Sequence, residues 1–475
     1  MSGEPPVLLE HATRDLARFA AGLRYQDLPA EVVAHAKLCL LDGVGVCLQG
    51  ALLPWTRILQ EVVQDEGGSP VASLWGTGLR SSMTQAALVN STAGHGFEMD
   101  DIHKESILHP NSLTTPIALG WAEAQGGVSG QDLLAAIVAG YEVGTRVGNA
   151  ATMALFLDGF HPQGTSGTFV AAATAGRLRG LDAVQMQNAF GIAGSMAAGL
   201  MAAQEGAMVK RLHAGRAAQA GVLAASLAAR GFTGITEILE AGYGGYLSSF
   251  SSRPVPEKLI RGVGDTWETL NVGFKMYPTV TSIHTALDAL RHLMSAHGLA
   301  HQDIEQVEVG MGHMTYVHTA WPYRPAGTTA AQMNLSFGLA VTALGGNITA
   351  ADFTDDRLRD PQVLDFISRV RAHEDAEIEA MGAPFRHACR MRVTLRDGAI
   401  FHHEELDRRG SPENPVSFAE VEAKFRSNVA NLLSDAEAAV VVQQVGGFQA
   451  LTEFGDILSI LSADRRSTLH NKMTR

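Results

Sequence analysis

The fold class is decided by the stretch Met391-Arg392-Val393-Thr394-Leu395-Arg396-Asp397-Gly398-Ala399-Ile400. Apolar and polar side chains alternate with a period of two up to Leu395, which is typical of a strand with one buried face. Asp397-Gly398 then predicts a hairpin turn, because both residues tolerate positive φ. A second alternating run, Gln306–Met311, lies upstream. The sequence therefore predicts a sheet in this part of the chain.

Most of the remaining chain has helical periodicity. From Leu8 to about Glu240, apolar residues recur three and four positions apart, with small residues between them. The run Ser129-Gly130-Gln131-Asp132 predicts one helix start, because the serine can accept from free backbone amides and the aspartate complements the helix dipole. In the same helix Glu142 and Arg146 lie one turn apart and are expected to pair. The sequence predicts a mainly α protein.

Changes of pattern divide the chain into three segments. Residues 1–270 are predicted to form a helical domain, and residues 271–410 a smaller α+β domain. The run Arg408–Pro415 has the composition of a linker. Helical periodicity resumes from about Ser417, so residues 411–475 are expected to form helices that could rejoin the first domain. A chain of 475 residues is too long for one ordinary core, which agrees with at least two domains.

Composition and charge argue against several classes of protein. A formal net charge of −13 disfavours general nucleic-acid binding, which needs an extended basic stripe. The apolar stretch Ala189–Ala203 is shorter than the roughly 20 residues that cross a bilayer, so we interpret it as a buried helix and expect no membrane partner. Cys39, Cys47 and Cys389 do not suggest disulfides, and Met1–Pro6 lacks the basic flank of a secretion signal. These features predict a reduced, cytoplasmic location.

Four segments crowd charged and imidazole side chains into apolar surroundings, each at a break marked by glycine or proline: Gly94–His103 with His109-Pro110, Gly159–Gly164, Lys210–Gly215 and Phe274–Pro278. A basic cluster taken alone is more often a solvated surface, and acids near a helix start are as often caps. Finding all four at such breaks favours a site, and we predict that they converge on a small polyanion. The candidate site residues are Glu98, Asp100, Asp101, His103, His109, His161, Lys210, Arg211, His213, Lys275 and Tyr277.

Proton removal next to a carboxylate would need these residue types. The resulting carbanion places negative charge on an already negative group, so nearby cations must offset it. Lys210 and Lys275 are the expected carboxylate ligands, with Arg211 as a further candidate. A neutral histidine can remove the proton, and His109 and His161 are expected to share the acid and base roles.

The acidic residues have two possible roles. Glu98 or Asp101 would orient an imidazole or tune its pKa. The acids and histidines between positions 95 and 109 could instead ligate zinc or iron, but the sequence has no His-Glu-x-x-His motif and no recognisable facial-triad spacing. It also has no phosphate loop or dinucleotide fingerprint in a suitable context. We therefore predict metal-free chemistry without a cofactor.

These motifs and their order along the chain resemble those of the MmgE/PrpD family. The resemblance covers nearly the whole chain. The matching segments are Glu98–His103 with His109-Pro110, Gly159–Pro162, Lys210–Gly215 and Lys275–Pro278. The family includes 2-methylcitrate dehydratase, cis-aconitate decarboxylase and iminodisuccinate epimerase, which act on small polycarboxylates without an obligatory metal or organic cofactor. The resemblance implies an all-helical bundle domain formed by both chain ends, an inserted α+β lid domain and a homodimer.

The resemblance also implies roles for individual residues. Ile102 replaces a threonine and Phe337 a tyrosine, which removes two hydroxyl donors and argues against cis-aconitate decarboxylation. The segment Ser106–Ser112 lacks the Trp-Gly that precedes the His-Pro-Ser motif of methylcitrate dehydratases. Glu98 stands where the decarboxylase branch has an aspartate. Positions counted as active-site residues in that branch are occupied by His109, His161, Lys210 and Lys275.

The sequence thus predicts a cofactor-independent lyase of a small di- or tricarboxylate, with 2-methylcitrate-like dehydration preferred. Iminodisuccinate-like epimerisation and cis-aconitate-type decarboxylation are alternatives. A non-catalytic, carboxylate-binding dimeric protein is the alternative of another class, and the missing hydroxyls at positions 102 and 337 are its best support.

Overall fold

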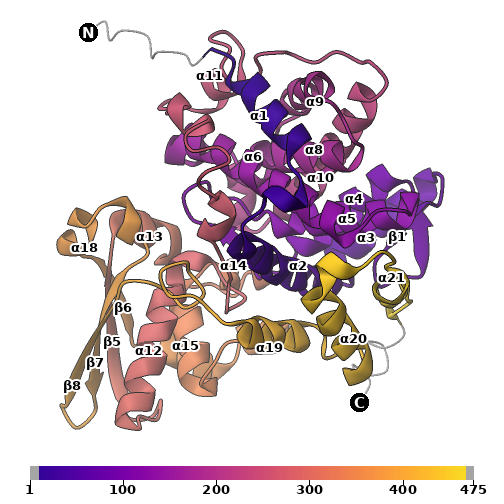
Figure 1. The fold of residues 1–475 in the computed structure, drawn as a ribbon. Helices are drawn as coiled ribbons and strands as arrows, with labels where there is room; N and C mark the ends of the chain where they lie inside the picture. Colours follow the sequence, from indigo (N-terminus) through magenta and orange to yellow (C-terminus); the bar gives the residue numbers. More distant parts are fainter. Residues whose placement is uncertain (1–9, 467–475) are drawn as a thin grey trace, which may run out of the picture.

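Helices form most of the computed structural model, which describes residues 10–466 (Figure 1). The prediction of a mainly α protein is confirmed. Met1–Pro6, which carry the argument on a secretion signal, lie outside the described residues. The principal helices of the first half are α1 Ala12–Gly22, α2 Ala30–Ala51, α3 Pro54–Glu66, α4 Met83–Gly94, α5 Asn111–Gln125, α6 Gly130–Leu157, α7 Pro162–Thr165, α8 Gly167–Leu178, α9 Ala183–Ser195, α10 Val209–Ala228 and α11 Tyr246–Phe250.

The second half contains the larger sheet and the helices that flank it (Figure 1). Its elements are α12 His284–His297, β5 Ile304–Met311, α13 His313–Thr319, α14 Thr328–Gln332, α15 Leu335–Gly345, α16 Asp355–Leu358, α17 Pro361–Ile367, β6 Val370–Glu374, α18 Ala376–Ala380, β7 Cys389–Leu395 and β8 Ile400–Glu405. The chain then ends with α19 Phe418–Val429, α20 Asp435–Gly446 and α21 Gly455–Ser462.

The predicted start of α6 is confirmed. The Ser129 hydroxyl accepts from the backbone amide of Asp132 at 3.1 Å, and the Asp132 carboxylate accepts in return from the Ser129 amide at 3.3 Å. This reciprocal arrangement satisfies two backbone donors that the helix itself leaves free. One turn apart in the same helix, Arg146 and Glu142 form the expected ion pair at 3.3 Å.

The predicted hairpin is confirmed as β7 and β8, which pair antiparallel with Thr394 opposite Ile400. The connection is longer than a two-residue turn, so among its residues Gly398 alone has positive φ, at 88°. The four-stranded sheet has the order β6-β5-β7-β8, with β5 antiparallel to β7 and parallel to β6. The second alternating run of the sequence is therefore the strand β5, in the middle of this sheet.

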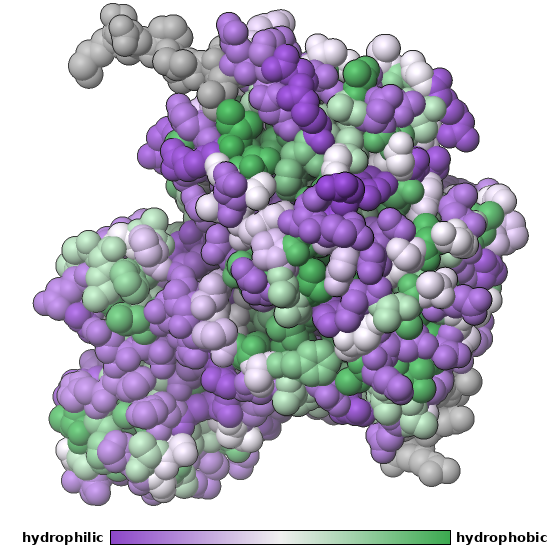
Figure 2. Space-filling view, in the orientation of Figure 1, coloured by the Kyte–Doolittle hydropathy of each residue, from purple (hydrophilic) through white to green (hydrophobic). Residues whose placement is uncertain are grey.

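The described residues form two hydrophobic cores. The first joins α1–α10 to the C-terminal helices, and Phe425 of α19 lies 3.0 Å from the Cβ position of Gly45 in α2. The second core, around β5 and β7, begins near Tyr277 and also takes in Phe97 from the α4–α5 connection. In Figure 1, α19 and α20 lie beside α2, and in Figure 2 the outline is indented between the two parts. The exact division of domains at residues 270 and 410 remains a prediction.

One helix prediction was wrong in its extent. The stretch Ala189–Ala203 is not a single buried helix, because α9 ends at Ser195 and Leu200 is exposed. No single described helix is long and apolar enough to cross a membrane; the pair α2 and α3, bent by 79°, passes the same test only when the two are taken together.

Two short strands that the sequence did not reveal bring the candidate site together. The strand β3, Ile102–His103, pairs antiparallel with β4, Val272–Gly273, so that Ile102 lies opposite Gly273. In an antiparallel pair, residues at equal distances from a paired position stay opposite each other. Lys275, two residues after Gly273, is thereby placed beside Asp100, two residues before Ile102. A small ladder between distant segments thus sets the register of the site.

Candidate active site

The acidic segment lies in the tight connection between α4 and α5. The end of α4 packs closely, since a Cβ on Gly94 would lie 2.8 Å from the Cys47 sulfur. Glu98 has a positive φ of 56°, which non-glycine residues adopt rarely. This backbone conformation is consistent with a functional constraint and coincides with the position of the Glu98 carboxylate among three cations.

Those cations are Lys210, Arg211 and Lys275. The first turn of α10 supplies Lys210 and Arg211, which both bond Glu98 Oε1, and Lys275 Nζ lies 3.2 Å from Glu98 Oε2. Burial alone would raise the pKa of Glu98, but the three positive charges hold it well below its usual range. Burial also lowers the pKa of Lys210 to about 8, against the opposing effect of Glu98.

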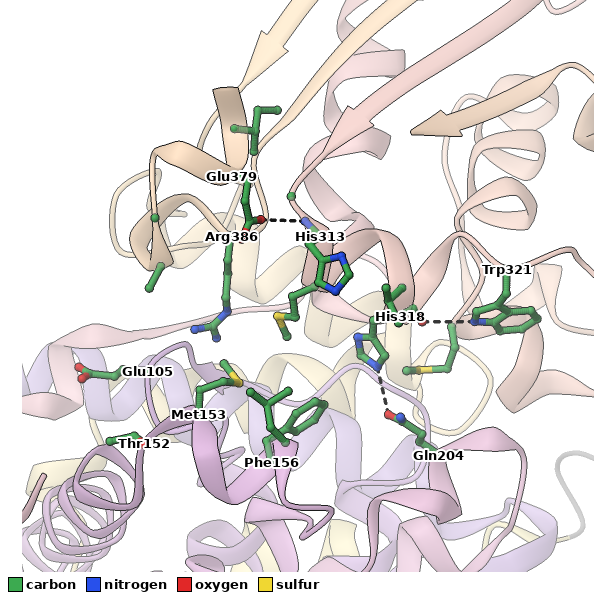
Figure 3. Close-up of a pocket in the computed structure, with 18 of the residues that line it drawn as sticks. Glu105, Thr152, Met153, Phe156, Gln204, His313, His318, Trp321, Glu379 and Arg386 are labelled. Carbon is green, nitrogen blue, oxygen red and sulfur yellow. Dashed lines mark hydrogen bonds between the residues drawn. The ribbon is translucent and has the colours of Figure 1, made fainter. Parts of the chain in front are cut away.

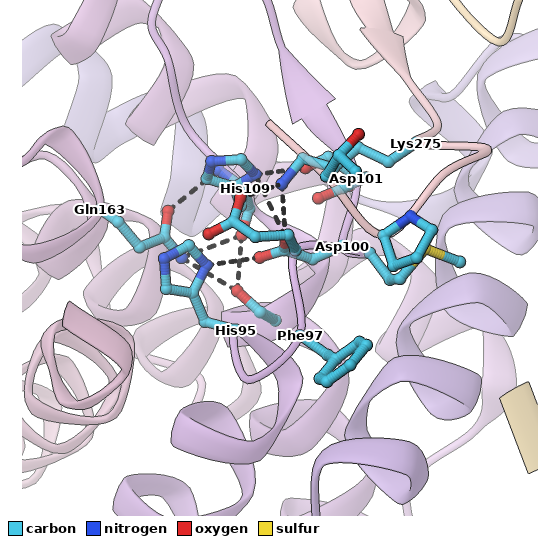
Figure 4. Close-up of polar contacts among 12 residues, drawn as sticks. His95, Phe97, Asp100, Asp101, His109, Gln163 and Lys275 are labelled. Atoms are coloured by element: carbon cyan, nitrogen blue, oxygen red, sulfur yellow. Dashed lines mark hydrogen bonds and ion pairs between the residues drawn. The ribbon is translucent and has the colours of Figure 1, made fainter. Parts of the chain in front are cut away.

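Asp100 connects one of these lysines to two histidines (Figure 4). Its Oδ1 lies 3.1 Å from Lys275 Nζ and 3.4 Å from His109 Nδ1, and its Oδ2 lies 2.6 Å from His95 Nδ1. Burial opposes ionisation of Asp100, but His109, Lys275 and His95 together lower its pKa. The same carboxylates outweigh the effect of burial on Lys275 and raise its pKa. Asp100 is therefore ionised, and Lys275 is protonated.

Four imidazoles form a row beside these charges. The ring centroids of His109 and His95 are 5.0 Å apart, those of His95 and His161 are 5.6 Å apart, and those of His161 and His213 are 5.0 Å apart. Burial lowers the pKa of all four, to about 3 for His109 and about 4 for His213. All four are consequently neutral near pH 7 and able to accept a proton.

The two predicted acid and base residues are held by different partners. His109 Nδ1 lies 2.6 Å from the carbonyl oxygen of Asp101 and donates to it, which leaves Nε2 with the lone pair. The Gln163 side chain fixes the backbone of His109 from both sides, at 2.9 and 3.0 Å. His161, at the start of α7, forms a hydrogen bond with His213 between their Nδ1 atoms, 2.8 Å apart, in which one ring donates and the other accepts. His109 and His161 are 7% and 6% exposed.

The structure brings His109, His161, Lys210 and Lys275 together, but it gives three supporting residues other positions. The Asp101 carboxylate bonds the Tyr141 hydroxyl at 2.6 Å and contacts no imidazole; its burial raises its pKa well above the usual range. Asp101 was expected to orient an imidazole or tune its pKa; it orients His109 through its backbone carbonyl and not through its carboxylate, because the tight turn directs that side chain towards α6. Glu98, the other residue expected in this role, raises the pKa of His95 and His109 by its negative charge. Asp100 is the carboxylate that contacts the imidazoles.

His103 and Tyr277 also bond residues outside the cluster. His103 Nε2 lies 3.0 Å from the Glu268 carboxylate, and its Nδ1 lies 2.8 Å from the Ser106 hydroxyl. The Tyr277 phenol donates to Asp288 and accepts from Arg291 within the second core. Alternation along β3 explains the position of His103, which is three residues from Asp100. Tyr277 lies beyond the end of β4, where the chain enters the second core.

His95 and Gln163 are parts of the cluster that the sequence analysis did not select as site residues. Each lies within a quoted or matching motif, His95 seven residues before Ile102 and Gln163 two residues after His161. Their contacts with Asp100 and with the His109 backbone depend on the folded connection and could not be read from spacing. In the sequence, the two residues stand out only because they lie in unusually polar segments. That feature does not distinguish a site residue from a residue that caps a helix.

The site has an excess of positive charge. Lys210, Arg211 and Lys275 face only two ionised carboxylates, those of Glu98 and Asp100. The neighbouring histidines are neutral, as described above, so they do not add to the charge. A field focused in this way attracts an anion even though the whole chain is negative.

A metal ion fits these residues poorly. His95, Asp100 and His109 do place three ligand atoms within 4.8 Å of one another, within the segment whose acids and histidines offered the metal alternative. However, the Lys275 ammonium lies 3.1 Å from the same Asp100 carboxylate. A fixed positive charge at that position repels a cation and competes for its main anionic ligand. Metal-free chemistry remains our prediction.

A cavity of about 1330 Å³ lies between the helical part and the α+β part (Figure 3). Phe156 of α6 contributes to one wall, and Trp321 and Arg386 contribute to the opposite wall. Its lining does not include the charged cluster, so cavity and cluster are adjacent rather than identical. His318 connects them, because it lines the cavity while burial and the charge of Lys210 lower its pKa to about 4.

Comparison with known proteins gives matches over nearly the whole chain. The family models for the MmgE/PrpD N-terminal and C-terminal domains match residues 14–258 and 277–445. A cis-aconitate decarboxylase of Aspergillus terreus is 28% identical over 477 residues, covering 96% of this chain and 97% of that protein. The human cis-aconitate decarboxylase is 28% identical over 469 residues, with 96% and 95% covered. These matches support the predicted lyase class.

Proposed function

Because the chain belongs to the MmgE/PrpD family, we propose that it is a lyase that acts on a small di- or tricarboxylate by proton transfer at a carbon next to a carboxylate. The observation that carries this proposal is the buried cluster in which three cations and four neutral imidazoles surround only two ionised carboxylates. Such a cluster supplies both the anion site and the proton-transfer groups that this chemistry needs.

In this proposal the lysines bind the substrate. Lys210 and Lys275, with Arg211, already hold the Glu98 carboxylate, which supports their role as ligands of a substrate carboxylate. A substrate carboxylate would share these donors and offset the remaining positive charge. Substrate would arrive through the adjacent cavity, where Arg386 and Arg324 offer further positive charge. Closure of the α+β part over the site is part of the same proposal.

Decarboxylation is the first reaction we propose. The bond between the reacting carbon and one carboxylate breaks, carbon dioxide leaves, and the electron pair stays on carbon next to the carboxylate that the lysines hold. A proton from Lys210, whose pKa is about 8, then completes the product. The names of the relatives support this choice. The missing hydroxyl at position 337 no longer argues against decarboxylation, because the Phe337 side chain lies in the second core and stacks on Tyr323.

Dehydration of a 2-methylcitrate-like substrate is the second candidate. One imidazole would remove a proton from carbon while another protonates the departing hydroxyl group, and His109 and His161 could take these roles. Buried Ile102, which lacks the threonine hydroxyl of the decarboxylase branch, favours this reaction over decarboxylation. Epimerisation would use the same imidazoles without loss of a group, and a protein that only binds carboxylates would use the lysines alone.

The test is incubation of the purified protein in deuterium oxide with cis-aconitate, 2-methylcitrate, citrate and iminodisuccinate. We expect carbon dioxide or water to be released, with deuterium incorporated at carbon. His161→Ala is expected to lose nearly all turnover and keep its far-ultraviolet circular dichroism. Tight binding with no product, exchange or inversion for any of the four compounds would favour a binding protein and reject the lyase.

We also propose a homodimer. Several large apolar side chains before and within the start of α10 are exposed, including Leu200 at 62%, Met208 at 52% and Val209 at 46%. Exposed large apolar side chains close together in sequence support an interface with a second copy, which would cover them. Light scattering after size-exclusion chromatography is expected to give twice the 50.4 kDa mass of the chain, and a monomer at micromolar concentration would reject the dimer.

A further inference from the structure

His95 has one nitrogen fully engaged and the other unpartnered. Its Nδ1 lies 2.6 Å from Asp100 Oδ2, and since that carboxylate is ionised, Nδ1 must carry the hydrogen. Its Nε2 therefore has the lone pair, and this atom is buried without a hydrogen-bond partner. Leaving a buried acceptor unpaired costs about 1–3 kcal/mol. A carboxylate that fixes one nitrogen and leaves the other free is the arrangement that prepares an imidazole to accept a proton.

The position of this ring supports a role in proton transfer. His95 lies between His109 and His161, at centroid distances of 5.0 and 5.6 Å. It is only 1% exposed, whereas the other two are slightly more accessible. His109 and His161 are thus the rings more open to a ligand, and His95 lies beside both of them. The charged groups that act on it are Asp100 and Glu98 on its own connection and Lys210 on α10, and Lys275 after β4 contacts the same Asp100 carboxylate.

We propose that His95 is a proton-relay residue that exchanges a proton between His161 and His109 during turnover, an inference that rests on the proposed function. In the step, Nε2 uses its lone pair to form an N–H bond with a proton released by one neighbouring imidazole or by a water molecule between the rings. Asp100 offsets the charge of the resulting imidazolium. Loss of the same proton from Nε2 to the second neighbour restores the neutral ring, so no co-reactant is consumed.

A relay of this kind resets the site. In the proposed dehydration both imidazoles begin neutral, so the one that removes the proton from carbon ends protonated, while the one that protonates the departing hydroxyl group must first receive a proton. His161 and His109 are bonded through their Nδ1 atoms to His213 and to the Asp101 carbonyl, respectively. Their other nitrogens are the ones left for the ligand and for His95. The free Nε2 of His95 is suited to connect them without displacing either bond.

The decisive variant is His95→Asn, whose amide nitrogen replaces Nδ1 and keeps a donor towards Asp100 but has no counterpart of Nε2. We expect kcat to fall about 100-fold or more, the range associated with loss of a proton-transfer group, while KM changes less than about threefold. The matched control is His284→Asn. His284 is also buried with an unpartnered ring nitrogen, at Nδ1, but it bonds Thr279 in the second core, and we expect its kcat to remain within about threefold of wild type.

A second measurement does not depend on turnover. Nitrogen-15 spectra of histidine-labelled protein, with the His95 signals identified by their absence in His95→Asn, are expected to show a neutral ring protonated at Nδ1. Protonation at Nε2 instead would overturn the relay, because that nitrogen could not then accept. Wild-type turnover together with a fully active His95→Asn would reject the relay alone, whereas absence of wild-type turnover on all four compounds would reject the proposed function and the relay with it.

Discussion

Stability should fall steeply in mild acid because the site buries neutral histidines. For His109, burial lowers the pKa from 6.5 to about 3. Between these two values the unfolded chain binds a proton that the folded chain does not, so stability rises with pH and is lost as pH falls below 6.5. From pH 7 to pH 5 this single group should remove about 2 kcal/mol, since each pH unit within the window corresponds to about 1.4 kcal/mol.

The perturbation is His109→Gln, which removes the titrating ring. Urea unfolding of both proteins at pH 7 and pH 5 gives the loss of unfolding free energy over that interval for each. The variant is expected to lose about 2 kcal/mol less than wild type. His402→Gln, at an exposed position on β8, should behave as wild type. Equal losses for wild type and His109→Gln would refute the reasoning that His109 is buried in its neutral form.

Three further predictions concern packing and charge. Gly50→Ala should lower the unfolding free energy by about 3 kcal/mol, because its Cβ would lie 1.8 Å from a backbone carbonyl of α4. The control is Gly22→Ala, whose Cβ would have no atom within 4 Å and which should be neutral or slightly stabilising. Lys424→Met should lower the unfolding free energy by about 3–5 kcal/mol, because the buried carboxylate of Asp42 loses its ion-pair partner at 2.6 Å. The double variant Lys424→Met with Asp42→Asn should recover part of that loss in the same urea assay. Lys275→Gln should lower kcat/KM about 100-fold or more with little change in circular dichroism; unchanged kinetics would remove this lysine from the site.

Local signals predicted the elements whose cause is local. The cap at Ser129 and Asp132 and the turn at Gly398 depend on side-chain and backbone preferences within a few residues, and the structure contains both. The pairing of β3 with β4 and the parallel neighbour of β5 depend on segments far apart in sequence. Short strands of two residues have no detectable alternation, so no local pattern could have indicated them.

The candidate site was predictable in its residue types but not in its contacts. Lysine, arginine and histidine in glycine-marked breaks indicated an anion site, and the fold brings the four principal residues together. Which carboxylate orients an imidazole depends on the direction of successive side chains in one tight turn, where Asp100 points inward and Asp101 towards Tyr141. A change of one position reverses that direction, which sequence spacing cannot resolve.

The central claim is that the cluster around Glu98 and Asp100 binds the carboxylates of a substrate. A crystal structure of the protein with bound citrate, a non-reacting tricarboxylate for a decarboxylase, tests it most directly. We predict a ligand carboxylate within about 3 Å of Lys210 Nζ or Lys275 Nζ, with a ligand carbon facing His109 or His161. Citrate held only in the outer cavity, with these lysines still bonded to Glu98 and Asp100 alone, would contradict the account.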